Sequence, residues 1–157
     1  MKIAGRAVCV PADVDTDLII AGRYLRTRDR SLWAAHAFED LDRTLAGRLA
    51  GAVVVAGPNF GCGSSREQAA IALREAGVKA VVAPSFARIF YRNAINLGLP
   101  IAEAALECAE GEMVEVDLEA GFARSGDRPP VRVSPLSSRM RAILAAGGLV
   151  ELLKDSP

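Results

Sequence analysis

Short apolar runs alternate with helix-forming segments through the middle of the sequence, and this alternation restricts the possible folds more than any other feature. Three of the runs fit buried strands, and the two segments between them fit helices that each stop at a glycine. In chain order these segments are 52–56, 67–76, 79–83, 86–97 and 99–102. A strand–helix–strand–helix–strand order implies parallel strands joined by right-handed crossovers.

The segments on either side extend this core. We expect a strand over 4–10, a weak helix over 31–46, a strand pair formed by 113–118 with 131–133, and a helix over 135–146. No linker, internal repeat or low-complexity tract divides the sequence. The sequence therefore predicts a single α/β domain over residues 1–157, with helices packed around a mainly parallel sheet.

Composition excludes several classes of function. The 19 basic and 19 acidic residues cancel, which argues against a nucleic-acid or membrane-surface partner. Aromatic residues make up only 5% of the chain, too few for a base-stacking surface. The longest uncharged stretch, 49–65, is interrupted by Pro58 and several glycines, so it does not read as a membrane span. With no recognisable signal peptide at its start, the chain is predicted to be cytoplasmic.

The most chemically informative segment is residues 59–66, which read NFGCGSSR and immediately precede the first helix of the core. Backbone N–H groups at a helix start point outward, and the helix dipole favours negative charge there. Ser64, Ser65 and Arg66 add two hydroxyls and a guanidinium to that position. The Walker A, dinucleotide-binding and serine-hydrolase fingerprints are all missing. We therefore interpret the segment as an anion site of another kind.

A purely structural interpretation of the same residues is a capping box, in which Ser64 caps the helix and Glu67 reaches back. It explains one serine and the glutamate. It leaves Ser65, the paired glycines and Arg66 unexplained, and an arginine at a helix start is mildly unfavourable against the dipole. An anionic ligand for Arg66 explains that placement better.

The cysteines and acidic residues offer little support for a metal site. Cys9, Cys62 and Cys108 are widely spaced and form no C-x-x-C motif, so a disulfide framework or an iron–sulfur site is not expected. Cys62 is interpreted as a small filler beside the active loop, and the other two cysteines as core residues. The acidic residues at 13, 15 and 17 lack the rest of a calcium loop and favour a turn instead. His36 is interpreted as structural.

Three blocks of the sequence resemble the small, swivelling domain of the aconitase superfamily, and most closely the family of 3-isopropylmalate dehydratase small subunits. They are NFGCGSSRE at 59–67, DVDTDLII at 13–20, and SFARIFYRN at 85–93 with NLGLP at 96–100. The blocks occur in family order over about the first 100 residues. The resemblance implies a swivelling β/β/α domain of aconitase type.

The resemblance also implies a function. Such subunits take part in a hydro-lyase reaction of leucine biosynthesis that interconverts 2-isopropylmalate and 3-isopropylmalate by dehydration and rehydration. Its [4Fe–4S] cluster is expected on a large partner subunit, with no cofactor on this chain. By resemblance, Ser64 matches the base, and Ser65 and Arg66 match ligands of a substrate carboxylate. The supporting loop residues are Asn59, Gly61, Cys62 and Gly63.

The free energy needed to activate Ser64 agrees with an active site that is shared between two subunits. Helix-terminus electrostatics supply about 0.3–1 kcal/mol, or about 2 kcal/mol when partly buried. A tenfold change in acidity needs about 1.4 kcal/mol, so the helix alone activates Ser64 very little. Preorganised donors, Arg66 and a dry interface with the partner must supply the rest. The chain by itself is therefore expected to be inactive.

Substrate identity depends on the loop YLRT at 24–27. In two-subunit members of the superfamily, the corresponding loop contacts the variable group of the substrate, which here points to Leu25, Arg26 and Thr27. Arg26 suits an extra carboxylate, as in a homoaconitase-like tricarboxylate, whereas Leu25 suits an isopropyl group. A solvated basic loop is the structural alternative. A non-catalytic anion-binding module is the alternative from a different functional class.

Overall fold

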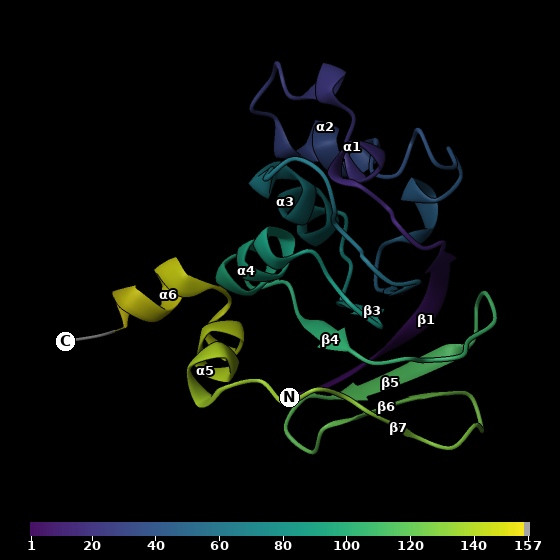
Figure 1. Cartoon of the computed structure of the whole chain (residues 1–157). Coiled ribbons are helices and arrows are strands. Elements are labelled where there is room, and N and C mark those ends of the chain that lie inside the picture. The colour runs from purple at the N-terminus through teal and green to yellow at the C-terminus, as the bar shows by residue number, and fades with distance from the viewer. Residues whose placement is uncertain (156–157) are drawn as a thin grey trace.

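One seven-stranded sheet organises the chain, with strand order β4-β3-β2-β1-β5-β6-β7 (Figure 1). The computed structural model describes residues 1–155. In chain order the strands are β1 (Lys2–Val10), β2 (Val53–Ala56), β3 (Ala80–Ala83), β4 (Ile101–Glu103), β5 (Met113–Asp117), β6 (Phe122–Ser125) and β7 (Val131–Arg132). Strands β1 to β4 are parallel, and β5 to β7 continue the sheet in antiparallel pairing. The predicted α/β class is confirmed, and its parallel part is the predicted alternating core.

Strand β1 joins the two halves of the sheet. Its first part, residues 2–6, pairs antiparallel with β5, and its last part, residues 7–10, pairs parallel with β2. The long β1 therefore belongs to both halves and fixes their relative position. The strands of the parallel half are short, and β2 and β3 are buried at every position, as strands covered on both faces must be.

Helices cover the parallel half of the sheet. The helices are α1 (Thr16–Ile19), α2 (Arg30–Ala35), α3 (Glu67–Glu75), α4 (Arg88–Asn96), α5 (Ser138–Ala146) and α6 (Leu149–Lys154), with 3₁₀ turns η1 (Gly22–Tyr24) and η2 (Ala46–Arg48). In Figure 1, α3 and α4, the two crossover helices, lie side by side, with α1 and α2 beyond α3. Small residues on α3 allow this close packing, since Ala69, Ala70 and Ala72 are fully buried.

Two predictions about the flanking elements are wrong. The helix predicted over 31–46 is only α2, because the chain reverses at Phe38, which has a positive φ of 62°. The segments 113–118 and 131–133 do not pair directly, because β6 lies between them. The turn before β6 is set by Asp117, whose Oδ1 accepts hydrogen bonds from the backbone N–H groups of Glu119 at 3.0 Å and Ala120 at 2.8 Å.

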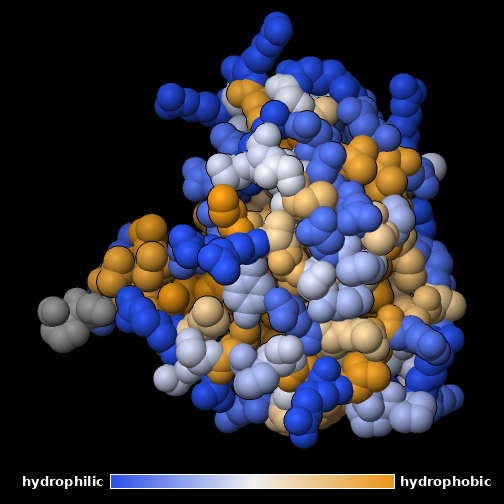
Figure 2. Space-filling model, viewed as in Figure 1, coloured by the Kyte–Doolittle hydropathy of each residue, from blue (hydrophilic) through white to orange (hydrophobic). Residues whose placement is uncertain are grey.

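The C-terminal segment also differs in detail from the prediction. Helix α5 begins at Ser138, three residues after Pro135, because the Ser137 hydroxyl caps it by accepting from the Met140 N–H at 3.1 Å. The short α6 was not predicted. Figure 2 shows apolar side chains gathered on α6, where Val150 and Leu153 are exposed. Among the described residues no helix is long and apolar enough to cross a membrane.

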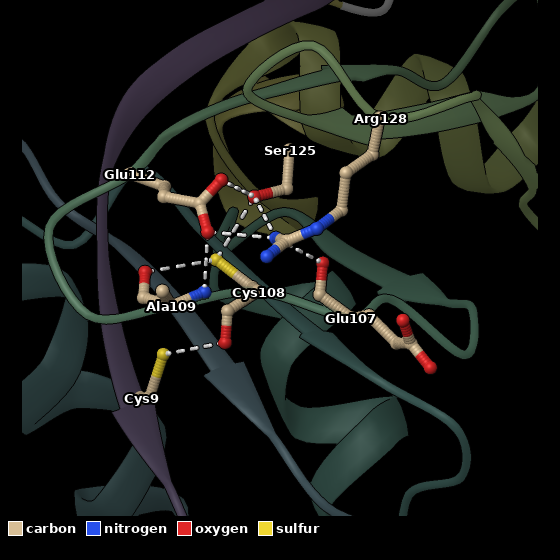
Figure 3. Close-up of polar contacts among 7 residues, drawn as sticks. All are labelled: Cys9, Glu107, Cys108, Ala109, Glu112, Ser125 and Arg128. Atoms are coloured by element: carbon tan, nitrogen blue, oxygen red, sulfur yellow. Dashed lines mark hydrogen bonds and ion pairs between the residues drawn. The ribbon is translucent and has the colours of Figure 1, made fainter.

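The two cysteines predicted as core residues, Cys9 on β1 and Cys108, are packed against the core and also take part in a polar network (Figure 3). Both Cys9 and Cys108 are half-buried and free. The Cys9 thiol contacts the carbonyl of Cys108 at 3.7 Å, and the Ser125 hydroxyl donates to the Cys108 sulfur at 3.2 Å. Burial, Cys108 and Glu110 raise the pKa of the Cys9 thiol to about 12. This thiol is therefore protonated at neutral pH.

Candidate functional site

Three loops meet where the parallel strands end. They follow β1, β2 and β3, and the carboxyl ends of parallel strands are where open α/β sheets form their sites. The middle loop, residues 57–66, is bound on one side to the loop after β1: Gly61 N–H donates to the Val14 carbonyl at 2.8 Å, and Thr16 N–H donates to the Cys62 carbonyl at 2.9 Å. The glycine segment is thus held by its own backbone.

The other side of the middle loop is bound to the loop after β3. Phe60 N–H donates to the Ser85 carbonyl at 3.1 Å, and Ala87 N–H donates to the Phe60 carbonyl at 2.9 Å. The Phe60 side chain is fully buried, with its ring centroid 5.2 Å from that of Phe90 on α4. The blocks that carried the sequence resemblance, far apart in the chain, therefore come together here.

Asn59 connects all three loops. It has a positive φ of 63°, a conformation that asparagine tolerates better than most residues. Its backbone N–H donates to the Ser85 hydroxyl at 2.8 Å, and its side-chain amide donates to Asp13 Oδ1 at 3.0 Å. Asn59 therefore stabilises the relative position of the three loops.

The two glycines of the loop are required for different reasons. Gly61 has a φ of 82°, and a Cβ placed there would lie less than 3.0 Å from three atoms of Phe90. Gly63 has a φ of 92°, and a Cβ there would lie 3.4 Å from that of Asp15, an ordinary contact. Gly61 is thus needed for close packing, and Gly63 for the backbone turn that leads to the serines.

Ser64 and Ser65 are exposed, and no described residue hydrogen-bonds to either hydroxyl. The predicted capping box is wrong: the N-cap is Arg66, which makes no side-chain cap, and α3 starts at Glu67. The Arg66 N–H donates instead to the Ser64 carbonyl at 2.9 Å. The loop is pulled toward α1 by its pairing with Thr16, so Ser64 lies before the helix rather than on its end. Its hydroxyl is consequently available for chemistry.

The Arg66 guanidinium faces Asp17 and lies next to Gly22. Its Nη1 forms an ion pair with Asp17 of α1, but without the geometry of a directed hydrogen bond. Its guanidinium nitrogens lie 3.6 and 3.7 Å from the position that a Cβ on Gly22 would occupy, so the bare glycine gives the group room. The contact with Asp17 is therefore charge to charge, and the buried Nη1 has no hydrogen-bond partner among the described residues.

The three acidic residues predicted to form a turn each make a different contact. Asp13 accepts from Asn59, and Asp15 caps α1 by accepting from the Leu18 N–H at 2.9 Å. Asp17 faces Arg66. The prediction missed this last contact, and the only signal for it was an arginine in need of a counter-charge at the start of α3.

The loop at 24–27 follows Gly22, the residue next to the Arg66 guanidinium. Its three predicted contact residues differ in their surroundings. Leu25 is half-buried and packs against the core. Thr27 accepts a hydrogen bond from the Asp29 N–H at 3.1 Å and so stabilises the turn before α2. Arg26 is exposed and makes no ion pair or hydrogen bond with any described residue. Only Arg26 has a fully uncommitted polar side chain.

The described residues show no cluster suited to a metal ion. No cluster of three or more His, Cys, Asp or Glu able to hold a metal ion occurs within residues 1–155. Cys62 is half-buried, and burial together with Asp15 and Asp13 raises the pKa of its thiol. A raised pKa disfavours the thiolate that a nucleophile or a cluster ligand requires.

The chain is similar to several proteins of known family. The Aconitase C-terminal domain family matches residues 12–105. The 3-isopropylmalate dehydratase small subunit of Pyrobaculum aerophilum is 50% identical over 160 residues, covering 99% of each chain. That of Moorella thermoacetica is 50% identical over 157 residues, covering 96% of this chain and 93% of the relative. A crystal structure of 3-isopropylmalate dehydratase from Methanocaldococcus jannaschii superposes with a TM-score of 0.93 at 48% identity, covering 98% of this chain and 94% of that one.

Proposed function

This chain belongs to the family of 3-isopropylmalate dehydratase small subunits, and we propose that it contributes the proton-transfer and carboxylate-binding half of a hydro-lyase active site. The reaction interconverts 2-isopropylmalate and 3-isopropylmalate in leucine biosynthesis by dehydration and rehydration. The observation that carries the assignment of roles lies at the carboxyl ends of the parallel strands. There the exposed hydroxyls of Ser64 and Ser65 have no partner among the described residues, and the Arg66 guanidinium makes an ion pair with Asp17 but no hydrogen bond through its buried Nη1.

Dehydration breaks a C–O bond at one carbon and a C–H bond at its neighbour. In our proposal Ser64 Oγ accepts the carbon-bound proton and returns it to either carbon on rehydration. Ser65 and Arg66 hold the carboxylate of the substrate, which fixes the reacting carbons in front of Ser64. Because Ser64 lies before the helix end, the α3 dipole contributes still less to its activation than a capping position would.

The rest of the site would come from a large partner subunit. A [4Fe–4S] cluster on that subunit would act as the Lewis acid for the leaving hydroxyl. This chain's part is to bind and orient the carboxylate, to move the proton at Ser64 and to exclude water once the two subunits close. The free thiols at Cys9, Cys62 and Cys108 suit a reducing compartment, so we place the complex in the cytoplasm.

A second candidate substrate is favoured by one observation. Arg26 is exposed, uncommitted and close in sequence to Gly22, where a Cβ would lie 3.6 and 3.7 Å from the two Arg66 guanidinium nitrogens. A guanidinium in that position pairs well with a third carboxylate, as in homocitrate-type tricarboxylates. The isopropyl group of isopropylmalate would instead contact Leu25. Both substrates would use the same Ser64 chemistry.

Reconstitution tests the proposed function. The purified chain alone is expected to be colourless and to turn over neither substrate, and to become active when mixed with a large iron–sulfur subunit. Isopropylmalate and homocitrate assayed side by side would then identify the preferred substrate. Turnover by the isolated chain, or failure to activate any iron–sulfur partner while binding anions tightly, would contradict the proposal and favour a stand-alone anion-binding module.

A further inference from the structure

Tyr24, at the base of the loop that carries Arg26, is held by an unusually dense set of contacts. Its hydroxyl donates to Glu39 Oε1 at 2.7 Å, and its ring stacks on that of His36 with centroids 4.2 Å apart and planes 10° apart. The Trp33 indole N–H donates to the Tyr24 carbonyl at 3.0 Å. The Arg23 guanidinium lies 4.9 Å from the centre of the Tyr24 ring. The loop therefore begins at a fixed point.

Glu39 is the common partner in this cluster. Besides the Tyr24 hydroxyl, its carboxylate contacts His36 Nδ1 through Oε2 and Arg23 Nη2 through Oε1, the latter at 3.2 Å. The hydrogen bonds from Tyr24, His36 and Arg23 lower the pKa of Glu39 to about 2. Asp40, its neighbour, binds Arg23 at 2.7 and 3.0 Å. Glu39 thus accepts hydrogen bonds from three side chains. Of these three residues, only Tyr24 belongs to the 24–27 loop.

The turn that carries Glu39 is itself fixed to the candidate active loop. Phe38 is fully buried, and its ring meets that of Phe60 edge-on with centroids 6.4 Å apart. The Phe38 N–H donates to the Ile19 carbonyl at 2.9 Å. Phe60 lies within the loop that presents Ser64. A rigid path of contacts therefore runs from the serine loop through Phe38 and Glu39 to Tyr24.

We propose that Glu39 is a positioning residue for substrate selection: it fixes Tyr24 and thereby sets where Leu25 and Arg26 stand relative to Ser64 and Arg66. The proposal rests on the proposed function for its kinetic consequence. Its structural consequence is that Tyr24, at the base of the loop, becomes mobile when the Glu39 side chain is removed. This consequence can be tested on the isolated chain, without the partner.

The isolated chain supplies the first test, because Trp33 is the only tryptophan and its indole is bonded to the base of the loop. Trp33 is 7% exposed. In Glu39→Ala, acrylamide quenching of Trp33 fluorescence should rise roughly twofold while the far-UV circular dichroism stays native. Asp42→Ala is the matched control, since Asp42 is a carboxylate of the same turn that bonds Thr44 and does not touch Tyr24.

The reconstituted complex supplies the second test. Glu39→Ala should raise KM roughly 5-fold with kcat nearly unchanged, and should alter the ratio of kcat/KM between isopropylmalate and homocitrate. Tyr24→Phe should give a similar shift, and the double variant should add little to either single variant. Glu39→Gln, which keeps an acceptor for Tyr24, should restore part of the selectivity.

Each outcome supports or contradicts the proposed role of Glu39. Unchanged quenching and selectivity in Glu39→Ala would overturn the proposal, as would an equal effect of Asp42→Ala or a loss of kcat with unchanged selectivity. If the wild-type chain activates no partner, the proposed function fails, and the quenching comparison alone then decides whether Glu39 holds the loop.

Discussion

Arg66 and Asp17 form an ion pair in which the guanidinium N–H does not point at the carboxylate oxygen. The pair joins the start of α3 to α1, and its Asp17 side is 62% exposed while its Arg66 side is 28% exposed. Asp17 therefore attracts the guanidinium and keeps it in place without using up its directed donors. In the proposed function, a substrate carboxylate would accept hydrogen bonds from this guanidinium.

Asp17→Asn should lower kcat/KM in the reconstituted complex by about 2- to 5-fold, mainly through KM. The charge that holds Arg66 is removed, so the guanidinium samples other positions before substrate binds. Glu115→Gln, which removes the partner of Arg124 on the antiparallel part of the sheet, is the control and should leave kcat/KM unchanged. A normal KM in Asp17→Asn would show that Arg66 is positioned by other contacts.

Ser64→Ala should reduce kcat by roughly 10²–10⁴-fold, the usual contribution of a general base, while KM changes little. Ser65→Ala removes a carboxylate ligand instead and should act mainly on KM. Steady-state kinetics of both variants with the same large subunit distinguish the two roles. Near-normal kcat in Ser64→Ala would refute its assignment as the base.

The sequence predicted the parallel core and the position of the active loop because both depend on local patterns. Buried runs such as 53–55 and the glycine segment at 61–63 are recognisable without knowledge of their partners. The position of Ser64 before the helix, with its hydroxyl exposed, could not be predicted from local patterns. A local rule makes Ser64 a helix cap. In the structure it precedes the N-cap, Arg66, and its loop is bound to the distant loop after β1 by the hydrogen bonds Gly61–Val14 and Thr16–Cys62.

The wrong pairing in the antiparallel half has a similar origin. Strand β6 is short, and its position depends on the turn that the Asp117 side chain stabilises. The contact between Asp17 and Arg66 also joins residues far apart in the chain. Pattern and propensity locate such residues, but the contacts they make depend on the assembled fold.

Gly61→Ala should lower the free energy of unfolding by about 2–4 kcal/mol, because the new Cβ would overlap Phe90 and the backbone has a positive φ. Gly51→Ala is a matched control: Gly51 also has a positive φ, 76°, but nothing lies within 4 Å of its Cβ position. Only the conformational cost of about 1 kcal/mol should remain there. Urea unfolding of the two variants measures the difference, and equal losses would show that the packing contact is unimportant.

Acidification should release the base of the 24–27 loop. The pKa of Glu39 is lowered from its ordinary value of 4.5 to about 2 by Tyr24, His36 and Arg23. A carboxylate with a lowered pKa stabilises the folded form above its unfolded pKa, and this contribution is lost as the pH falls through the folded value. Trp33 quenching should therefore rise between about pH 4.5 and pH 2. In Glu39→Gln that part of the transition should disappear, and a pH profile identical to wild type would contradict the role of Glu39.

Arg26→Val tests which substrate the chain selects. Arg26 has no partner among the described residues, so its removal should cost the fold almost nothing. If it pairs with a third carboxylate, kcat/KM for homocitrate should fall at least about 10-fold, the effect of losing a charge-assisted hydrogen bond. Isopropylmalate, which has no such group, should be affected little or even bind better beside the new apolar side chain. Equal changes for both substrates would mean that Arg26 does not determine selectivity, and that Leu25 alone faces the variable group.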